Sequence, residues 1–181
     1  ELIEGGTQLA QHRRELLPRL SPLTRLAYRR IASDQEELSL EYQPSVKEDF
    51  AVELAQCRSR ERALRSTLLG PHRDELDLRL DGKSAAQFAS EGQKRSVAMA
   101  LKIAQAEYLT GLHGTPPVLL IDDIMGELDV KRRSGFLPLL QRIEHARSQV
   151  FMTVTEENWP RELGRQLIRW EVSSGELRPA G

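Results

Sequence analysis

The clearest pattern of apolar and polar positions along the chain is a short apolar run that ends in acids. Residues 118–121, Val-Leu-Leu-Ile, follow a pair of prolines and lead directly into Asp122 and Asp123. A strand that is apolar at every position is covered on both faces, as in a parallel α/β sheet. The run therefore predicts a buried strand with acids at its carboxyl end, which is where open α/β sheets bind ligands.

A second pattern predicts a helix that begins just after Ser90. Ser90 and Gln93 fit the Ser-x-x-Gln capping box of a helix start. Apolar residues then recur at helical spacing and give the helix one apolar face: Val97, Leu101, Ala104 and Tyr108. Unpaired N–H groups at such a helix end can receive a phosphate, and Gly92 would allow a ligand to approach the backbone closely.

The remaining segments mix helical and strand patterns. Before residue 66, the sequence predicts helices over 2–17 and 22–31, broken at Pro18, then a strand over 38–42 and a charged helix over about 46–65. A strand over 76–80 ends in the turn signal Asp81-Gly82. The acids are followed by a predicted helix over 131–145, a strand over 149–154, a helix over 159–165 and an edge hairpin over 168–177. Strand–helix alternation in the second half favours a mostly parallel sheet flanked by helices.

The acids after the predicted strand suit a nucleotide site. One carboxylate in this place commonly holds the Mg²⁺ of a nucleoside triphosphate, and the next can polarise the attacking water. A plain acidic helix cap after a core strand is the alternative, but capping needs one acid and not three so close together. For the helix after Ser90, an ordinary capped helix is the corresponding alternative.

These motifs resemble those of ABC-type ATPases and, more closely, those of the RecF family of bacterial recombination proteins. Within the ABC pattern, residues 90–93 resemble the signature motif, 118–123 the Walker B strand and 126–129 the D-loop. Four blocks resemble the RecF family in order and spacing, from about residue 65 to the end: 70–76, 90–95, 122–129 and 149–153.

The resemblance implies an α/β fold, a P-loop NTPase core of the ABC type. This chain would carry the carboxyl-terminal half of that core over residues 67–181, with a small helical lid-type lobe over 1–66. An ABC-type site needs a Gly-rich loop ending in Gly-Lys-Ser/Thr, the Walker A motif, to cradle the phosphates. The sequence has no such run, since Gly5-Gly6 is followed by Thr7 and Gln8. We therefore expect this segment alone to bind ATP poorly and not to turn it over.

The resemblance also implies catalytic roles for the two acids. Asp122 would hold Mg²⁺, and Asp123 would be the catalytic acid in a place where many relatives carry a glutamate. Because aspartate is one methylene shorter, it reaches less far toward the attacking water. We therefore expect slow ATP hydrolysis, which suits a switch better than a motor.

Further positions would contact ATP across a dimer. By the resemblance, Ser90, Gly92 and Gln93 would face the γ-phosphate of ATP bound by a second subunit, and Asp129 would lie across the dimer interface. ABC-type ATPases often place a histidine at the end of the strand over 149–154. Thr153 and Thr155 stand there instead, and a hydroxyl can bond a phosphate or water without carrying charge.

Two other features allow competing interpretations. Glu91 departs from the glycine of the wider ABC signature, and we expect its carboxylate to point aside, toward Lys94 or Arg95. Asp74 could form a plain surface salt bridge with Arg73, or the loop 70–74 could help join the lid lobe to the nucleotide site.

Charge and composition limit the possible partners. The net charge of −1 gives no global field that draws the chain to nucleic acid, so any DNA contact must come from a local patch or from another part of the protein. Arg58, Arg62 and Arg65 share one face of a predicted helix, with Glu53 and Glu61 interleaved. This pattern favours a solvated helix face over a stripe that contacts phosphates.

Cysteine content and hydropathy bear on the compartment. Cys57 is the only cysteine, which excludes an internal disulfide and suits a reducing cytoplasm. No apolar stretch approaches the length that spans a bilayer.

The resemblance implies an ATP-dependent homodimer on double-stranded DNA near single-strand/double-strand junctions. It further implies help in loading the RecA recombinase at gaps during repair and replication, with RecR and RecO as partners. One alternative is an SMC-like or RecN-like ATPase, but the first region has no sustained heptads. The other is a metal-dependent nuclease or topoisomerase-type domain that uses four acids: Asp122, Asp123, Glu127 and Asp129. Adjacent strand residues point to opposite faces, so the first two acids would share a metal only after the strand has ended.

Overall fold

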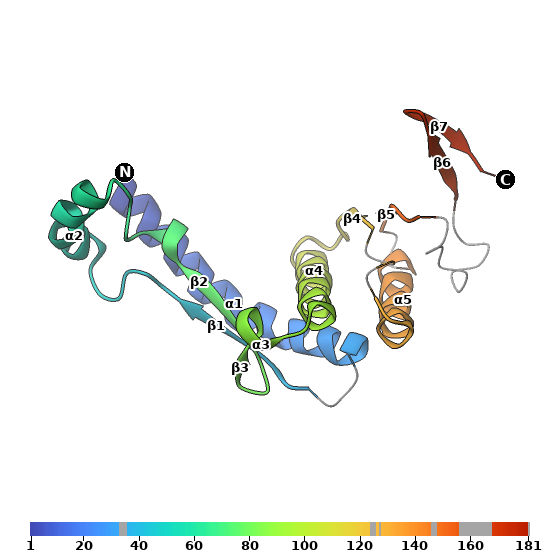
Figure 1. The fold of residues 1–181 in the computed structure, drawn as a ribbon, viewed down its shortest axis with the longest axis horizontal. Coiled ribbons are helices and arrows are strands. Elements are labelled where there is room, and N and C mark those ends of the chain that lie inside the picture. Colours follow the sequence, from blue (N-terminus) through green and yellow to red (C-terminus); the bar gives the residue numbers. More distant parts are fainter. Residues whose placement is uncertain (33–35, 124–125, 127, 146–147, 156–167, 181) are drawn as a thin grey trace.

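Helices and short strands alternate along an elongated molecule (Figure 1). The computed structural model describes residues 1–32, 36–123, 126, 128–145, 148–155 and 168–180. The elements of this part are α1 (Leu2–Ala32), β1 (Leu38–Gln43), α2 (Phe50–Leu64), a short 3-10 turn (Pro71–Arg73), β2 (Glu75–Leu80), β3 (Lys83–Ser84), α3 (Ala85–Phe88), α4 (Glu91–His113), β4 (Leu119–Ile121), α5 (Val130–His145), β5 (Val150–Met152), β6 (Trp170–Ser173) and β7 (Glu176–Pro179).

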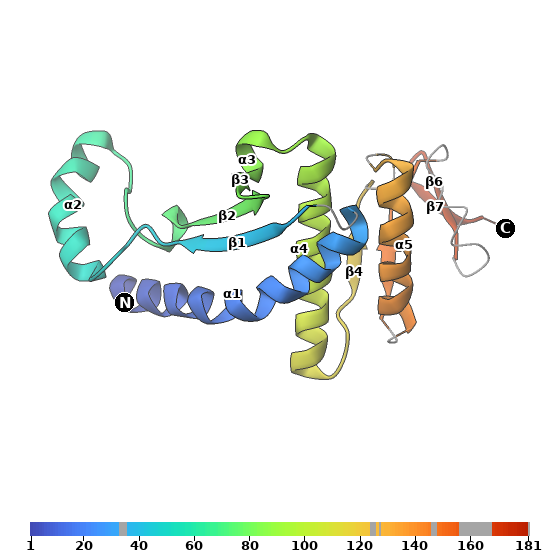
Figure 2. The same ribbon diagram turned by 90° about the horizontal axis from the view of Figure 1, so that it is seen from below.

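The first helix is longer than the sequence predicts. We expected a break at Pro18, but α1 continues through Pro18 and Pro22 to Ala32, so that prediction was wrong. Each proline removes one backbone hydrogen bond from a helix, and Figure 2 shows α1 changing direction along its course. The second part of the helix is nevertheless anchored, because Ala27, Tyr28 and Ile31 are buried in the core. Tertiary packing thus overrides the local cost of the prolines.

An antiparallel sheet joins the first and second predicted regions. β1 pairs with β2 in register from Leu38–Leu80 to Gln43–Glu75, and β2 turns back into β3 at Asp81-Gly82. The strand and turn predictions here are confirmed. The helix α2 lies in the chain between β1 and β2 and is capped by Asp49, whose side chain accepts a hydrogen bond from the Val52 N–H at 2.9 Å. The pairing of β1 with β2 crosses the predicted boundary between residues 66 and 67.

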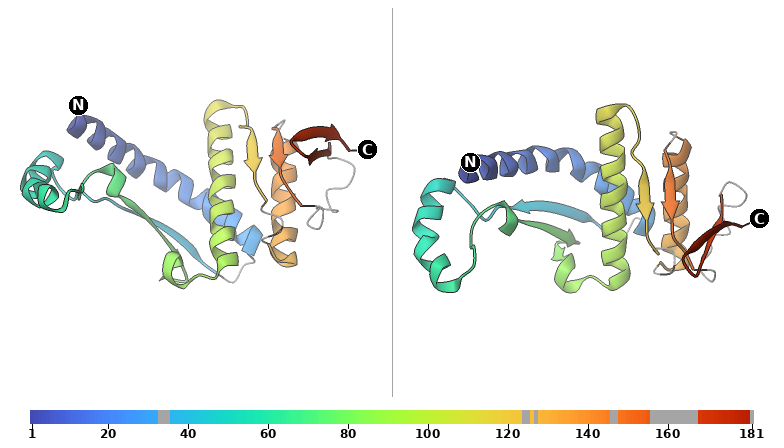
Figure 3. Two further views of the ribbon diagram at one scale, coloured as in Figure 1. Left: turned by 45° about the horizontal axis from the view of Figure 1, so that its top comes forward. Right: turned by 90° about the horizontal axis from the view of Figure 1, so that it is seen from above.

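A parallel pair of strands carries the acids. β4 and β5 pair in parallel, with Leu119 opposite Val150 and Ile121 opposite Met152. The predicted parallel arrangement of this part is confirmed. Figure 3 shows both arrows pointing toward the end of the molecule where α4 begins. The carboxyl ends of the strands and the amino end of the signature helix are therefore on the same side.

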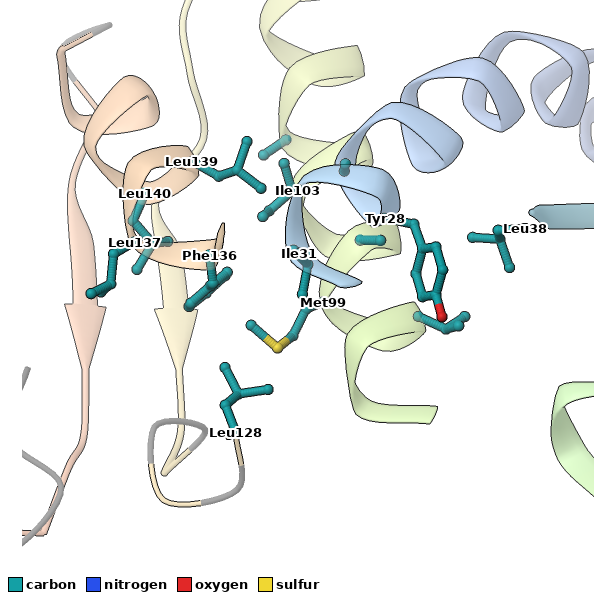
Figure 4. Close-up of a cluster of buried hydrophobic side chains, with 14 of the residues drawn as sticks. Tyr28, Ile31, Leu38, Met99, Ile103, Leu128, Phe136, Leu137, Leu139 and Leu140 are labelled. Carbon is teal, nitrogen blue, oxygen red and sulfur yellow. The ribbon is translucent and has the colours of Figure 1, made fainter. Parts of the chain in front are cut away.

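The core lies where α1, α4 and α5 meet. Buried side chains of the three helices gather there, with Leu128 below them near Met99 (Figure 4). α5 approaches α1 closely at Gly135, where an added Cβ would lie 2.0 Å from the Arg30 carbonyl oxygen of α1. Only glycine allows this contact, so the packing of α5 on α1 depends on it.

One face of the β4–β5 pair is bare within this chain. Leu120 and Phe151 are paired neighbours on the two strands, and they are 78% and 57% exposed. The expectation that the acidic strand is covered on both faces was therefore wrong for the described residues. The other side of the pair carries Leu119 and Ile121, which pack against the core.

The end of the chain forms the predicted hairpin. β6 and β7 pair antiparallel through a turn at Ser174-Gly175, as a separate two-stranded sheet. The helix predicted over 159–165 lies outside the described residues. No helix in the described part is long and apolar enough to cross a membrane.

Candidate functional site

The amino end of α4 has the predicted capping box. The Ser90 hydroxyl accepts a hydrogen bond from the Gln93 N–H at 3.3 Å, and the Gln93 Oε1 atom accepts one from the Ser90 N–H at 2.7 Å. This reciprocal pair fixes the start of the helix at Glu91. The remaining free N–H groups of the first turn therefore have a defined direction and can receive an anion.

The NH2 group of the Gln93 side chain contacts a residue far away in the sequence. Its Nε2 atom donates to Glu36 Oε1 at 2.6 Å, and the Tyr28 hydroxyl donates to Glu36 Oε2 at 2.5 Å. Burial, reinforced by the hydrogen bond to Glu36, raises the pKa of Tyr28 far above its usual value. Residues 90–93 at the start of α4, which we call the signature turn, are thus linked through Glu36 to Tyr28 of α1. The sequence did not predict this link, because its members are far apart in the chain.

Side chains around the turn explain the unusual Glu91. Its carboxylate accepts a hydrogen bond from Lys94 Nζ at 2.9 Å, as predicted. This bond and the charge of Lys94 hold the pKa of Glu91 below its usual value. The negative charge is therefore compensated locally, which leaves the turn less repulsive to a phosphate.

Thr153 links the ends of β4 and β5. Its hydroxyl donates to Asp122 Oδ1 at 2.5 Å and accepts from the Asp123 N–H at 2.9 Å, while its own N–H donates to the Ile121 carbonyl at 2.9 Å. Asp123 has a left-handed backbone, with φ of 43°. Both carboxylates are exposed. The strand has ended at this point, so a single hydroxyl places two neighbouring acids at the carboxyl end of the parallel pair.

Asp129 caps the helix that follows the acids. Its Oδ1 atom accepts from the Arg132 N–H at 2.8 Å, and its Oδ2 atom pairs with the Arg132 guanidinium. The backbone hydrogen bond from Arg132 is the main cause that lowers the pKa of Asp129. Leu128, just before it, is buried against α4. The end of the D-loop is therefore anchored on both sides.

Arg132 brings two motifs together. Its Nη1 atom would lie 3.1 Å from a Cβ placed on Gly92, and the same atom pairs with Asp129. The Nε atom of Arg132 is buried and has no hydrogen-bond partner among the described residues. The sequence marked Arg132 only as part of the basic run 131–133 after the D-loop, which could pair with acids across a dimer; its approach to Gly92 was not predicted, because nothing in the local pattern shows that α5 packs near the start of α4.

The predicted site residues thus form two groups in the part of the chain that the structure describes. Ser90, Gly92 and Gln93 lie at the start of α4, with Asp129 connected to Gly92 through Arg132. The second group is Asp122, Asp123 and Thr153, joined by hydrogen bonds. Glu127 lies outside the described residues, and those described include no cluster of three or more metal-ligating side chains.

Asp74 occupies a buried polar junction, not a surface pair with Arg73. Its side chain, 3% exposed, accepts hydrogen bonds from Arg13 Nη1 at 2.9 Å, from the Ser45 N–H and hydroxyl at 2.8 and 2.9 Å, and from the Tyr42 hydroxyl. We call these four residues the Asp74 junction. It joins α1 to the end of β1 and the start of β2. Arg73 instead donates to the Ser66 hydroxyl at 2.8 Å, so of the two interpretations the plain Arg73–Asp74 salt bridge is the one the structure contradicts.

Hydrogen bonds decide the charge state of the junction. Burial would raise the pKa of Asp74, but the bonds from the Ser45 N–H, Tyr42, the Ser45 hydroxyl and Arg13 together hold it below its usual value. Burial and the hydrogen bond to Asp74 raise the pKa of Tyr42. Asp74 is therefore an ionised acceptor whose partners come from segments well separated in the sequence.

Relatives and solved structures resemble this chain over nearly its whole length. The DNA replication and repair protein RecF of Symbiobacterium thermophilum is 37% identical over 174 residues, which cover 90% of this chain and 46% of the relative. No protein-family model matches the chain. The chain spans about half the length of the curated relatives it matches.

The structural comparisons extend this result. A structure of the recombination mediator protein RecF with ATPrS, in the RecFOR pathway, is 25% identical, with a TM-score of 0.75 over 99% of this chain and 48% of that chain. An SMC head bound to the winged-helix domain of ScpA is 14% identical, with a TM-score of 0.57 over 92% of this chain and 43% of that chain. The second likeness concerns the fold alone, which is that of an α/β ABC-type ATPase half.

Proposed function

We infer that this chain is homologous to the carboxyl-terminal half of the RecF family of DNA replication and repair proteins. From this premise, we propose that it supplies the signature, Walker B and D-loop half of an ATP-driven switch on DNA. The other half would bring the Walker A loop that cradles the phosphates. The observation that carries the proposal is that Thr153 holds the Asp122 carboxylate and the Asp123 backbone at the end of β4, on the side where α4 begins, with both acids exposed.

In this proposal, the two acids divide the chemistry. The exposed carboxylate of Asp122 fits as one ligand of Mg²⁺, an ion that usually binds one or two carboxylates, phosphate oxygens and several waters. Asp123 would polarise the water that attacks the γ-phosphate of ATP. Its short side chain would keep hydrolysis slow.

The signature turn would serve ATP bound to a second subunit. The backbone N–H groups at the start of α4 and the hydroxyl of Ser90 would face that γ-phosphate, beside Gly92 and Gln93. Asp129 would lie at the same interface. The dimer would be more stable with ATP than with ADP because the extra phosphate contributes contacts only in the ATP state.

The wider role would follow the RecF relatives. We propose binding to double-stranded DNA, at single-strand/double-strand junctions, and help in loading RecA with RecR and RecO as partners, in the cytoplasm. The likeness to a solved structure of the recombination mediator protein RecF in the RecFOR pathway supports this role.

The first experiment is ATP hydrolysis by the full-length ATPase, with and without duplex DNA, for the parent and Asp123→Asn. Asparagine tolerates the left-handed backbone at this position, so the variant tests the carboxylate and not the fold. We expect slow turnover that DNA stimulates, and a loss of about 100-fold or more in the variant, which should still dimerise with ATP. Asp49→Asn is the matched control, because asparagine also caps a helix start.

Each outcome has a defined meaning. If Asp123→Asn hydrolyses ATP as fast as the parent, Asp123 is not the catalytic acid. If the parent shows no turnover, the ATPase proposal fails. DNA cleavage with Mg²⁺ and without ATP would favour a nuclease or topoisomerase-type domain instead.

A further inference from the structure

The helix α2 lies apart from the rest of the molecule. Figure 1 shows it at the end opposite α4 and α5. Within α2, Phe50 is the buried residue, and the other side chains are exposed or half-buried. Its exposed positions include several arginines, and that charged surface is the feature of α2 that packing does not account for.

Three arginines of this region surround one shallow hollow. Arg58 and Arg62 are one helical turn apart on α2, and Arg65 follows at the end of the helix with a left-handed backbone. All three are exposed, and they line a hollow of about 310 Å³ together with Glu61, Ser66 and Thr67. We call Arg58, Arg62 and Arg65 the arginine face.

The acids that could neutralise this face are engaged by the backbone. Glu53 Oε1 accepts from the Lys47 and Glu48 N–H groups at 2.9 and 2.6 Å, at the start of the helix. Glu61 Oε1 accepts from the Leu68 N–H at 2.7 Å, beyond its end. The exposed arginines agree with the predicted solvated helix face, but in the described part of the chain neither glutamate forms an ion pair with Arg58, Arg62 or Arg65.

The guanidinium groups of the arginine face are available to bind another molecule. Within the described part of the chain, Arg58, Arg62 and Arg65 have no hydrogen-bond or ion-pair partner for their guanidinium groups. The neighbouring loop adds Arg73, which the Ser66 hydroxyl holds beside the hollow at 2.8 Å. The net charge of the chain is only −1, so this is a local positive patch on a nearly neutral molecule.

We propose that the arginine face docks on the phosphate backbone of double-stranded DNA, an inference that rests on the proposed function. Guanidinium groups bind phosphate oxygens in a planar, bidentate geometry. The aromatic side chain of α2 is buried Phe50, so the face offers no ring on which unpaired bases could stack, as single-strand binders do. Contacts of this kind carry no sequence information and position the protein on the duplex.

The position of the face matters for the switch. It lies far from the start of α4 and the end of β4 (Figure 1), so it can hold DNA without entering the nucleotide site. In an ATP-dependent dimer, each subunit would contribute one such face.

The test measures binding of a fluorescent duplex of about 30 base pairs to the full-length ATPase with ATP, between about 0.05 and 0.2 M salt. The variant replaces Arg58, Arg62 and Arg65 by glutamine. We expect weaker binding and a weaker salt dependence. The magnitude of the slope of log affinity against log salt should decrease by about 3, close to one for each lost phosphate contact. The matched control replaces three exposed arginines of α1, namely Arg14, Arg19 and Arg25, by glutamine and should keep most of the slope.

ATP hydrolysis without DNA and the thermal unfolding midpoint serve as internal checks, and both should match the parent. If the variant binds the duplex with the parent's affinity and slope, the inference is overturned while the proposed function stands. An equal loss in both triple variants would also overturn it, because general charge and not this face would then bind DNA. If the parent does not bind the duplex at all, the proposed function itself fails.

Discussion

The Asp74 junction and the β4–β5 pair differ in how much of their environment this chain provides. Asp74 is a charged side chain that is 3% exposed, and every partner it needs comes from the chain itself. Leu120 is an apolar side chain of β4, in the two-stranded β4–β5 sheet, and is 78% exposed. The comparison teaches that the Asp74 junction finds all its hydrogen-bond partners within the chain, whereas the exposed face of β4 needs another surface to cover it.

Breaking the Asp74 junction should have the largest effect on stability. In Asp74→Asn, an amide group that donates replaces an oxygen that accepts, so at least one of the half-buried donors of Arg13, Tyr42 or Ser45 loses its partner on the buried side chain. We expect the free energy of unfolding to fall by about 2–4 kcal/mol in urea denaturation. Glu75→Gln, an exposed neighbour on β2, is the control and should change it by less than about 0.5 kcal/mol.

The pH dependence of the same variant separates charge from shape. The pKa of Asp74 is lower in the folded than in the unfolded chain, so its stabilisation is present above the unfolded pKa of about 4 and is lost as the pH falls through the folded pKa. The difference in unfolding free energy between parent and variant should therefore shrink below about pH 4. A constant difference down to pH 2 would contradict the role of the carboxylate charge.

The helix cap at Ser90 should give an intermediate effect, because its hydrogen bonds are local and exposed. Ser90→Ala removes the acceptor for the Gln93 N–H, and we expect a loss of about 1 kcal/mol in unfolding free energy. Ser90→Thr keeps the hydroxyl and should recover most of it. Equal stability of the alanine variant and the parent would show that the capping box contributes nothing.

The bare strand face should give the smallest effect in this chain. Leu120→Ser replaces a side chain that is already in water, so we expect a change in unfolding free energy within about 0.5 kcal/mol. Leu137→Ala, at a site 4% exposed, is the contrasting control and should cost about 2–5 kcal/mol. Equal losses in the two variants would mean that Leu120 is covered after all. In the full-length ATPase, where we expect the other half to cover this face, Leu120→Ser should become costly.

Elements specified by local rules were predictable. The capping box at Ser90, the hairpin turn at Asp81-Gly82 and the parallel placement of the acidic strand all follow from short-range patterns. The error in α1 has a different origin. Pro18 disfavours a helix locally, but burial of Ala27, Tyr28 and Ile31 against α4 and α5 decides the outcome.

The candidate site shows the same division. The sequence indicated Asp122 and Asp123 because acids at the end of an apolar strand are a local signal. It did not indicate the hydroxyl of Thr153 as their link, since that bond spans 31 residues for Asp122 and 30 for Asp123. The approach of Arg132 to Gly92 was not predicted, because it depends on how α5 packs beside α4.

By itself, then, the sequence determined the longer strands of the first sheet, the helix start after Ser90 and the acidic motif at the end of β4, because hydrogen-bond caps, turn residues and apolar periodicity act between near neighbours in the chain. The tertiary structure alone decided which distant groups meet. Arg13 reaches Asp74 across 61 residues and Gln93 reaches Glu36 across 57. It also decided which charges stay unpaired on α2 and which apolar face stays bare on β4. Those outcomes depend on how helices and strands pack, and the spacing of residues along the chain does not encode the partner that each surface finds.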